Sequence, residues 1–158
     1  MFKDLFKHKY NVSAPDRRTV DEIVFDSMIE SEVYVFIRDN FKKGTWSRQP
    51  KYELQPKFRD KTGKVNLPIT YSGDFLVPKD NVVIDVKGFS DQKFALKKKM
   101  FLFHNREMEL IEVKTVRDVR ELAEKRGWLD PKKAALLPAL RPRKPKKKKE
   151  KKPAPPVQ

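Results

Sequence analysis

Two aspartates in neighbouring β-rich segments are spaced so that they could bind a divalent cation. Asp74 lies in the segment 69–77 (ITYSGDFLV) and Asp85 in the segment 82–86 (VVIDV), and a turn-forming segment, 78–81 (PKDN), separates the two. Alternating apolar residues and the Pro-Lys-Asp-Asn turn predict a β-hairpin. A hairpin doubles the chain back on itself, so we expect Asp74 to lie beside Asp85.

Two carboxylates held this close repel each other unless a cation lies between them. Hard oxygen ligands favour Mg²⁺ or Mn²⁺ over zinc. Successive strand residues face opposite sides, so Lys87 projects beside Asp85 while Val86 turns into the core. An ammonium group there is suited to orienting a water molecule and to stabilising negative charge that develops on phosphorus. Glu30, on an upstream helix, is the right kind of residue to hold a metal-bound water or a second metal.

The helix that carries Glu30 begins with a recognisable cap. Ser27 followed three residues later by Glu30 forms the S-x-x-E capping box, and the helix is predicted to run to about Asn40. Glu32 is the rival carboxylate, about 200° away around the helix, so only one of the two faces the site. Glu30 is better placed, because it adjoins the apolar face of Ile29, Val33, Phe36 and Ile37.

Periodicity and turn residues predict the remaining elements. They are a short strand (19–25), a proline-containing edge or bulged strand (46–58), a loop (60–63), a helix (89–105), a buried strand (109–113) and a last helix from Thr115 to Lys125 ended by Gly127. The order helix, strand, strand, strand, helix, strand, helix indicates an α/β fold with a mixed central sheet flanked by helices.

Charge is distributed unevenly along the chain. The 158 residues include 37 Lys and Arg against 22 Asp and Glu, a net charge of +15, of which the segment 141–152 carries +8 and residues 1–140 carry +7. Such an excess indicates a polyanionic partner, most often nucleic acid. We therefore expect a basic N-terminal arm (1–18), a folded domain (19–130) and a Pro/Lys-rich disordered tail (131–158). The tail is interpreted as a phosphate clamp or as a solubilising or localising segment.

Several other classes of protein are excluded. The chain has no cysteine, so disulfide scaffolds and cysteine-based metal sites are ruled out. His8 and His104 are isolated, which argues against a His-based metal site or a catalytic triad. No Gly-rich phosphate loop occurs, which argues against a nucleotide cofactor. There is no run of 18 apolar residues and no secretory signal, so we expect a cytoplasmic protein without a membrane partner.

The pattern E…GDFLV…VVIDVKG resembles the PD-(D/E)XK nuclease superfamily, whose core has the order α-β-β-β-α-β. The segments VDEIVFDSMIESEVY, YELQPKF, ITYSGDF, VVIDVKGF and FALKKKMFLF are similar to a family of small phage nucleases, some of which are thought to be Holliday junction resolvases. The likeness runs from about Lys9 to Lys114, and Gly73 stands where the superfamily has a leading proline. It implies a restriction-endonuclease-like core with an extra C-terminal helix.

The resemblance also implies an activity and its residues. Glu30, Asp74, Asp85 and Lys87 would be catalytic, and Mg²⁺, with Mn²⁺ as a substitute, would be held by Asp74, Asp85 and the Val86 carbonyl, with Glu30 binding directly or through water. The expected reaction is hydrolysis of DNA to a 5′-phosphate and a 3′-hydroxyl. The expected substrate is a four-way junction, cut by paired nicks from a homodimer in the cytoplasm of the host cell.

Two alternatives stay open from the sequence. The first is a PD-(D/E)XK nuclease that acts on other DNA, in replication, packaging or restriction. The second is a non-enzymatic basic nucleic-acid binder in which the hairpin acids form a surface salt bridge. Residues 112–114 (EVK) are a second copy of the acid-x-Lys pattern (D-x-K) that Asp85 and Lys87 form. This copy lacks an acid on a preceding hairpin strand and is interpreted as an ordinary strand end. The candidate DNA-binding residues are Lys42, Lys43, Lys97, Lys98 and Lys99, with Arg141, Arg143, Lys144, Lys146, Lys147, Lys148 and Lys149 in the tail.

Overall fold

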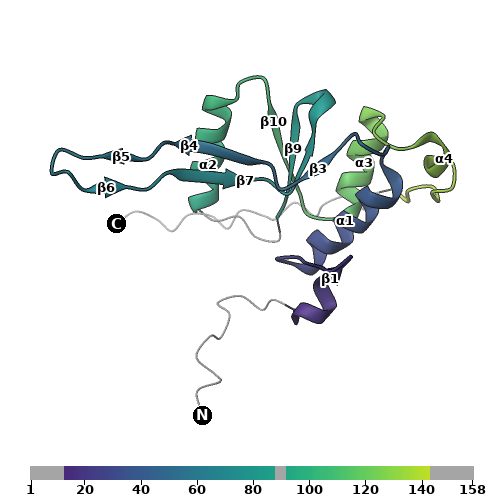
Figure 1. Cartoon of the computed structure of the whole chain (residues 1–158). Helices are drawn as coiled ribbons and strands as arrows, with labels where there is room; N and C mark the ends of the chain where they lie inside the picture. The colour runs from purple at the N-terminus through teal and green to yellow at the C-terminus, as the bar shows by residue number, and fades with distance from the viewer. Residues whose placement is uncertain (1–12, 88–91, 143–158) are drawn as a thin grey trace, which may run out of the picture.

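A mixed four-stranded sheet forms the centre of the computed structural model, which describes residues 13–87 and 92–142 (Figure 1). The strand order is β10 (Glu109–Val113), β9 (Val82–Val86), β8 (Phe75–Val77) and β3 (Ser47–Arg48). β9 pairs in parallel with β10 and antiparallel with β8, and β8 pairs antiparallel with β3. The predicted hairpin of β8 and β9 is therefore confirmed.

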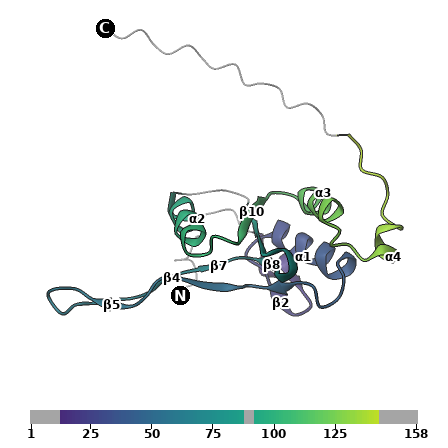
Figure 2. The ribbon, with the colours of Figure 1, turned by 90° about the horizontal axis from the view of Figure 1, so that it is seen from above.

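Helices cover both faces of this sheet. α1 (Met28–Asn40) and α3 (Val116–Arg126) pack on one face, and α2 (Gln92–His104) packs on the other (Figures 1 and 2). Side chains alternate along β9, so Ile84 belongs to the core shared with α1 and α3, while Val83 belongs to the core under α2. The α/β class, with a mixed sheet flanked by helices, is confirmed.

The caps predicted from the sequence set the ends of two helices. Ser27 precedes α1, and its hydroxyl accepts a hydrogen bond from the Glu30 N–H. Thr115 forms a reciprocal capping box with Asp118 at the start of α3, and Gly127 ends that helix in the left-handed region at φ +68°. The expected helix 89–105 begins at Gln92, and residues 88–91 lie outside the described part.

A long hairpin, called here the extended hairpin (residues 51–72), projects from the body (Figures 1 and 2). Its inner half pairs β4 (Lys51–Gln55) with β7 (Ile69–Ser72), and its outer half pairs β5 (Phe58–Arg59) with β6 (Val65–Asn66). Prolines at the boundary between the two halves, Pro56 and Pro68, lack the N–H needed to continue the ladder.

The predicted continuous strands 46–58 and 69–77 are wrong, because each changes sheet partway. The first breaks after β3 at Gln49, which has a φ of +47°, and Pro50. The second breaks at Gly73, between β7 and β8. A Cβ atom on Gly73 would lie 2.4 Å from the Val83 Cγ1 atom, so only glycine fits where the chain crosses between sheets. A proline at that position would clash for the same reason.

The predicted strand 19–25 is instead a small hairpin that follows a 3₁₀ turn, η1 (Pro15–Arg18). β1 (Thr19–Val20) pairs antiparallel with β2 (Ile23–Val24), and the two turn residues between them have φ values of +51° and +63°. Positive φ at both central positions is typical of a tight hairpin turn. The predicted turn after β8 is confirmed as η2 (Pro78–Asp80).

The folded body extends beyond Asp130, where the tail was expected to begin. A short helix, α4 (Pro131–Ala134), follows, and Ala134 and Leu137 pack against the core that contains Trp128. The boundary at residue 130 is therefore too early. Among the described residues, no helix is long and apolar enough to cross a membrane.

Candidate active site

The end of β9 brings the buried Asp85 and the partly exposed Lys87 together in an ion pair. Asp85 is 1% exposed, and the Lys87 Nζ atom lies 2.8 Å from its Oδ2 atom. The Tyr71 hydroxyl donates a hydrogen bond of 3.1 Å to the other oxygen, Oδ1. The ammonium also lies 4.3 Å from the centre of the Phe94 ring on α2, which supports it by a cation–π contact. Both ends of the pair are thus held in place.

Asp74 lies beside this pair because the chain crosses between sheets immediately before it. The register of β8 and β9 pairs Phe75 with Ile84. Beyond that pair, the Asp74 side chain takes the place of a backbone acceptor on β8, because its Oδ2 atom accepts a hydrogen bond of 2.6 Å from the Val86 N–H. The N–H and C=O of one strand residue point toward the same neighbouring strand. The Val86 carbonyl therefore faces Asp74.

Glu30 approaches the same point from α1, on the opposite face of the sheet. Its side chain is 7% exposed, and its Oε2 atom accepts a hydrogen bond of 3.2 Å from the Asp26 N–H. It interacts electrostatically with both Asp74 and Lys87. Glu32, the alternative carboxylate on this helix, is exposed. The structure thus brings Glu30, and not Glu32, toward the end of β9.

All three carboxyl groups are less acidic than usual. Burial raises the pKa of Asp74 to about 7, against the opposing effect of the hydrogen bond from the Val86 N–H. Burial also raises the pKa of Asp85, and the Lys87 ammonium opposes that rise. The pKa of Glu30 is raised by burial and by the negative charge of Asp26. Each group is therefore costly to keep ionised, and a bound cation would favour the ionised forms.

The donor groups at the end of β9 fit a hard divalent cation. The Asp85 Oδ2 atom is buried, and its partner within the described residues is the Lys87 ammonium at 2.8 Å. Together with Asp74 and the Val86 carbonyl it offers oxygen ligands of the kind that Mg²⁺ prefers. Within residues 13–87 and 92–142, no three Asp, Glu or His side chains alone form a metal site. Water molecules would complete the coordination, as is usual for Mg²⁺.

Two residues near this site were not predicted from the sequence. Tyr71 is buried on β7, and its hydroxyl donates a hydrogen bond to Asp85. The sequence indicates its burial only by its place two residues after Ile69, on the same face of the strand. Arg48 lies over the rings of Phe25 and Tyr34, at 4.7 and 5.2 Å. Its positive charge opposes the rise in the pKa of Glu30 that burial causes.

Replacing Tyr71 with Phe should destabilise the protein and slow any reaction that depends on Asp85. The substitution leaves a buried carboxylate oxygen without its donor, at a cost of about 1–3 kcal/mol in the free energy of unfolding. Urea denaturation measures this loss. The matched control is Tyr52→Phe, because Tyr52 stacks on Tyr71 at 6.3 Å without bonding to Asp85. Equal stability of the two variants would contradict a role for the Tyr71 hydroxyl.

The lysines of α2 differ in their surroundings. Lys98 forms a partly exposed ion pair of 2.7 Å with Glu112, the acid of residues 112–114 (EVK). Lys97 is half-buried and Lys99 is exposed. Of the three candidate DNA-binding lysines on this helix, Lys99 is the most accessible and Lys98 is already engaged.

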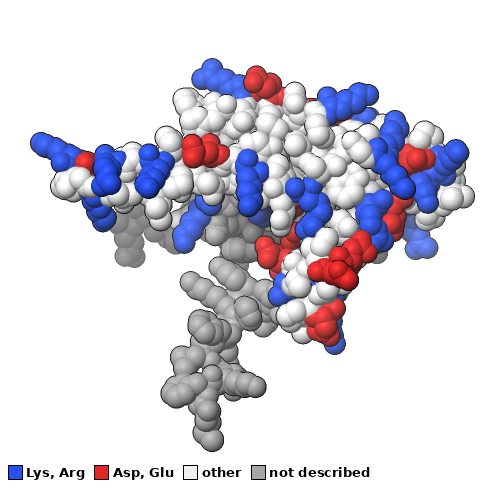
Figure 3. Space-filling view, viewed as in Figure 1, with Lys and Arg blue, Asp and Glu red and all other residues white. Residues whose placement is uncertain are grey.

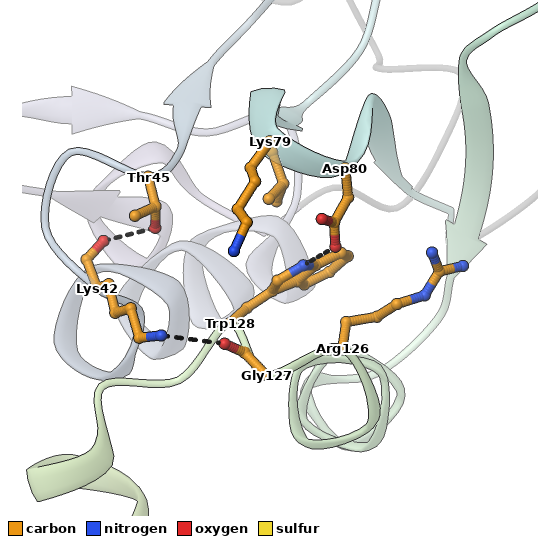
Figure 4. A pocket seen from close by; sticks show the side chains of 8 residues that line it. Lys42, Thr45, Lys79, Asp80, Arg126, Gly127 and Trp128 are labelled. Atoms are coloured by element: carbon orange, nitrogen blue, oxygen red, sulfur yellow. Dashed lines mark hydrogen bonds between the residues drawn. The ribbon is translucent and has the colours of Figure 1, made fainter.

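Lys42 and Lys43 lie at the other end of the sheet, away from Asp85. Lys42 lines a pocket of about 110 Å³ with Asp80 and Trp128, whose indole N–H donates a hydrogen bond of 2.6 Å to Asp80 (Figure 4). Asp80 closely precedes the start of β9, whereas Asp85 stands at its end. In the tail, Arg141 is exposed, and Arg143, Lys144 and residues 146–149 lie outside the described part.

Comparison with known proteins identifies a family. A family model described as "Protein of unknown function (DUF1064)" matches residues 7–120, a span that contains Glu30, Asp74, Asp85 and Lys87. The chain belongs to this family. No curated protein matches the chain. No solved structure matches it either.

Proposed function

We propose that this member of the DUF1064 family is a metal-dependent DNA endonuclease with a PD-(D/E)XK core. The observation that carries the proposal is the group at the end of β9, where a buried aspartate is paired with Lys87 at 2.8 Å and a second aspartate lies at the adjoining strand break. Buried acids have a cost in stability, and a role in binding a cation gives a reason to keep them.

The arrangement of the elements supports this proposal. Along the chain, α1 is followed by the central-sheet strands β3, β8 and β9, then by α2 and the parallel strand β10, and this order is compatible with the α-β-β-β-α-β order of that superfamily. Gly73, which departs from the superfamily's leading proline, is explained by the close approach of Val83. The departure therefore does not weaken the resemblance.

The proposed mechanism follows from the positions of the side chains. Asp74, Asp85 and the Val86 carbonyl would hold Mg²⁺, which when bound polarises the scissile phosphate and acidifies water. Lys87, fixed by Asp85 and Phe94, positions the attacking water and neutralises charge developing on the phosphate. The water oxygen bonds to phosphorus, the P–O3′ bond breaks, and the departing 3′ oxygen takes up a proton. The products are a 5′-phosphate and a 3′-hydroxyl.

Branched DNA, and a four-way junction in particular, is the proposed substrate. A net charge of +15 suits contact with several duplex arms at once, since phosphate contacts need no base sequence. Two cuts on opposite strands require two sites, so a homodimer with twofold symmetry is the proposed assembly.

We expect purified protein to nick a labelled four-way junction symmetrically in Mg²⁺ and to leave a linear duplex of the same sequence largely intact. The symmetry reflects two equivalent sites in the dimer. Product mapping on denaturing gels measures both substrates, with a chelator as the control for metal dependence. Equal cutting of junction and duplex would contradict junction selectivity and leave a nuclease of other specificity. Binding without any cutting, in Mg²⁺ or Mn²⁺, would instead favour a non-enzymatic binder.

A further inference from the structure

The outer half of the extended hairpin, residues 56–68, packs on nothing else in the described chain. Neither core cluster contains any of its residues. Its apolar side chains are accordingly open to solvent, with Phe58 45% and Leu67 75% exposed. An exposed two-stranded segment gains little stability by itself. Its presence therefore calls for a partner outside the body.

The charge of this segment indicates the kind of partner. It carries four basic residues and one acid, and basic side chains stand along the projecting hairpin (Figure 3). The one acid, Asp60, is used internally, because its Oδ1 atom accepts hydrogen bonds from the Thr62 N–H and hydroxyl and from the Lys64 N–H. These bonds fix the turn, and the Arg59 guanidinium donates a further hydrogen bond of 2.9 Å to the Gly63 carbonyl. The side chains of Lys57, Arg59, Lys61 and Lys64 are all exposed to solvent. Two such segments would repel each other, so a polyanion fits better than a second copy.

The hairpin is connected directly to the candidate active site. β7 runs into Gly73 and Asp74, and β4 follows Arg48 and Gln49, whose N–H donates to the Asp74 carbonyl. From Asp74 to the tip at Gly63, a strand rising about 3.3 Å per residue spans about 36 Å. One turn of duplex DNA is about 34 Å long. The tip therefore reaches about one helical turn from a phosphate bound at Asp74.

We propose that residues 56–68 grip the phosphate backbone of duplex DNA about one helical turn from the cleaved bond. The contacts would come from Lys57, Arg59, Lys61 and Lys64. This inference rests on the proposed function in taking DNA as the ligand, and it adds a specific element and a distance along the duplex.

The test replaces these four residues with glutamine and measures binding to a four-way junction in chelator, where no cleavage occurs. Removing one basic side chain from a phosphate lowers the slope of log K against log salt by about 0.9, so we expect a decrease of up to about 3.6 and at least a tenfold weaker affinity at low salt. The control variant replaces four exposed lysines near the far end of the sheet, Lys79, Lys125, Lys132 and Lys133, and changes the net charge equally. It should leave the slope near that of the wild type.

The length of the DNA arms separates this inference from a general charge effect. With junction arms shorter than one helical turn, the hairpin variant and the wild type should bind alike, because the contacted phosphates are missing. Unchanged salt dependence on long arms would overturn the proposal. In that case, aggregation of the variant would mean that the basic side chains protect exposed strand edges. A change in its sedimentation would mean that the hairpin contacts a second copy of the chain. Since binding is measured without cleavage, absence of nuclease activity would refute the proposed function and leave this result standing.

Discussion

Replacing Asp85 with Asn is expected to abolish cleavage while DNA binding is retained. Asparagine keeps the size of the side chain and the oxygen that accepts from Tyr71, but it removes the negative charge that would hold the cation. A metal ion contributes several kcal/mol of transition-state stabilisation, and a loss of about 4 kcal/mol corresponds to a rate about 10³-fold lower. Single-turnover cleavage of a labelled junction measures this effect.

Glu112→Gln is the matched control, because Glu112 lies opposite Asp85 in the register of β9 and β10 and belongs to the second copy of the pattern. This variant loses the ion pair with Lys98 and should cut at close to the wild-type rate. Equal losses in the two variants would mean that a general change in charge on the sheet is responsible. Full activity of Asp85→Asn would remove Asp85 from the mechanism.

Replacing Lys87 with Gln is expected to lower the cleavage rate by about 10²–10⁴, the range for loss of a group that positions or activates a nucleophile. The same change leaves the buried Asp85 carboxylate without its positive partner. In chelator, the free energy of unfolding should therefore fall by about 3 kcal/mol, because the Asp85 carboxylate stays buried without a charged partner. Added Mg²⁺ should restore much of this stability, because a cation takes over the role of the ammonium, but it should not restore the rate.

Lys114→Gln supplies the control for this substitution. Lys114 occupies the position of Lys87 in the second copy of the pattern, and its side chain is exposed at the end of β10. Neither stability nor cleavage should change measurably. A rate loss in Lys87→Gln that disappeared once Mg²⁺ had restabilised the protein would show that the lysine is structural and takes no part in the chemistry.

Local signals in the sequence predicted most of the central fold. Ser27 and Gly127 mark helix ends by backbone chemistry that acts within a few residues, and the apolar run of β9 is bounded by a strong turn. The extended hairpin could not be predicted in the same way. Its course depends on strand changes at Gln49 and Gly73, and the second is set by a side-chain position, that of Val83 on the adjoining strand β9, which residue periodicity does not give.

The candidate site shows the same division. Period-two alternation placed Asp85 and Lys87 on one face, and the apolar face of Ile29 and Val33 placed the adjoining Glu30 on the inner side of α1. Alternation did not reveal that the Asp74 carboxylate replaces a strand by accepting the Val86 N–H, because that bond depends on the break at Gly73. Nor did it reveal Tyr71, whose contact with Asp85 joins two different sheets.

Cleavage of a labelled four-way junction by the wild-type protein, in Mg²⁺ and in chelator, tests the central claim most directly. The proposed site predicts nicks that require the divalent cation and that end in a 5′-phosphate and a 3′-hydroxyl, as end-specific phosphatase and ligase treatment would reveal. DNA that is bound but stays intact with Mg²⁺ and with Mn²⁺ would contradict it. The buried acids at the end of β9 would then be structural.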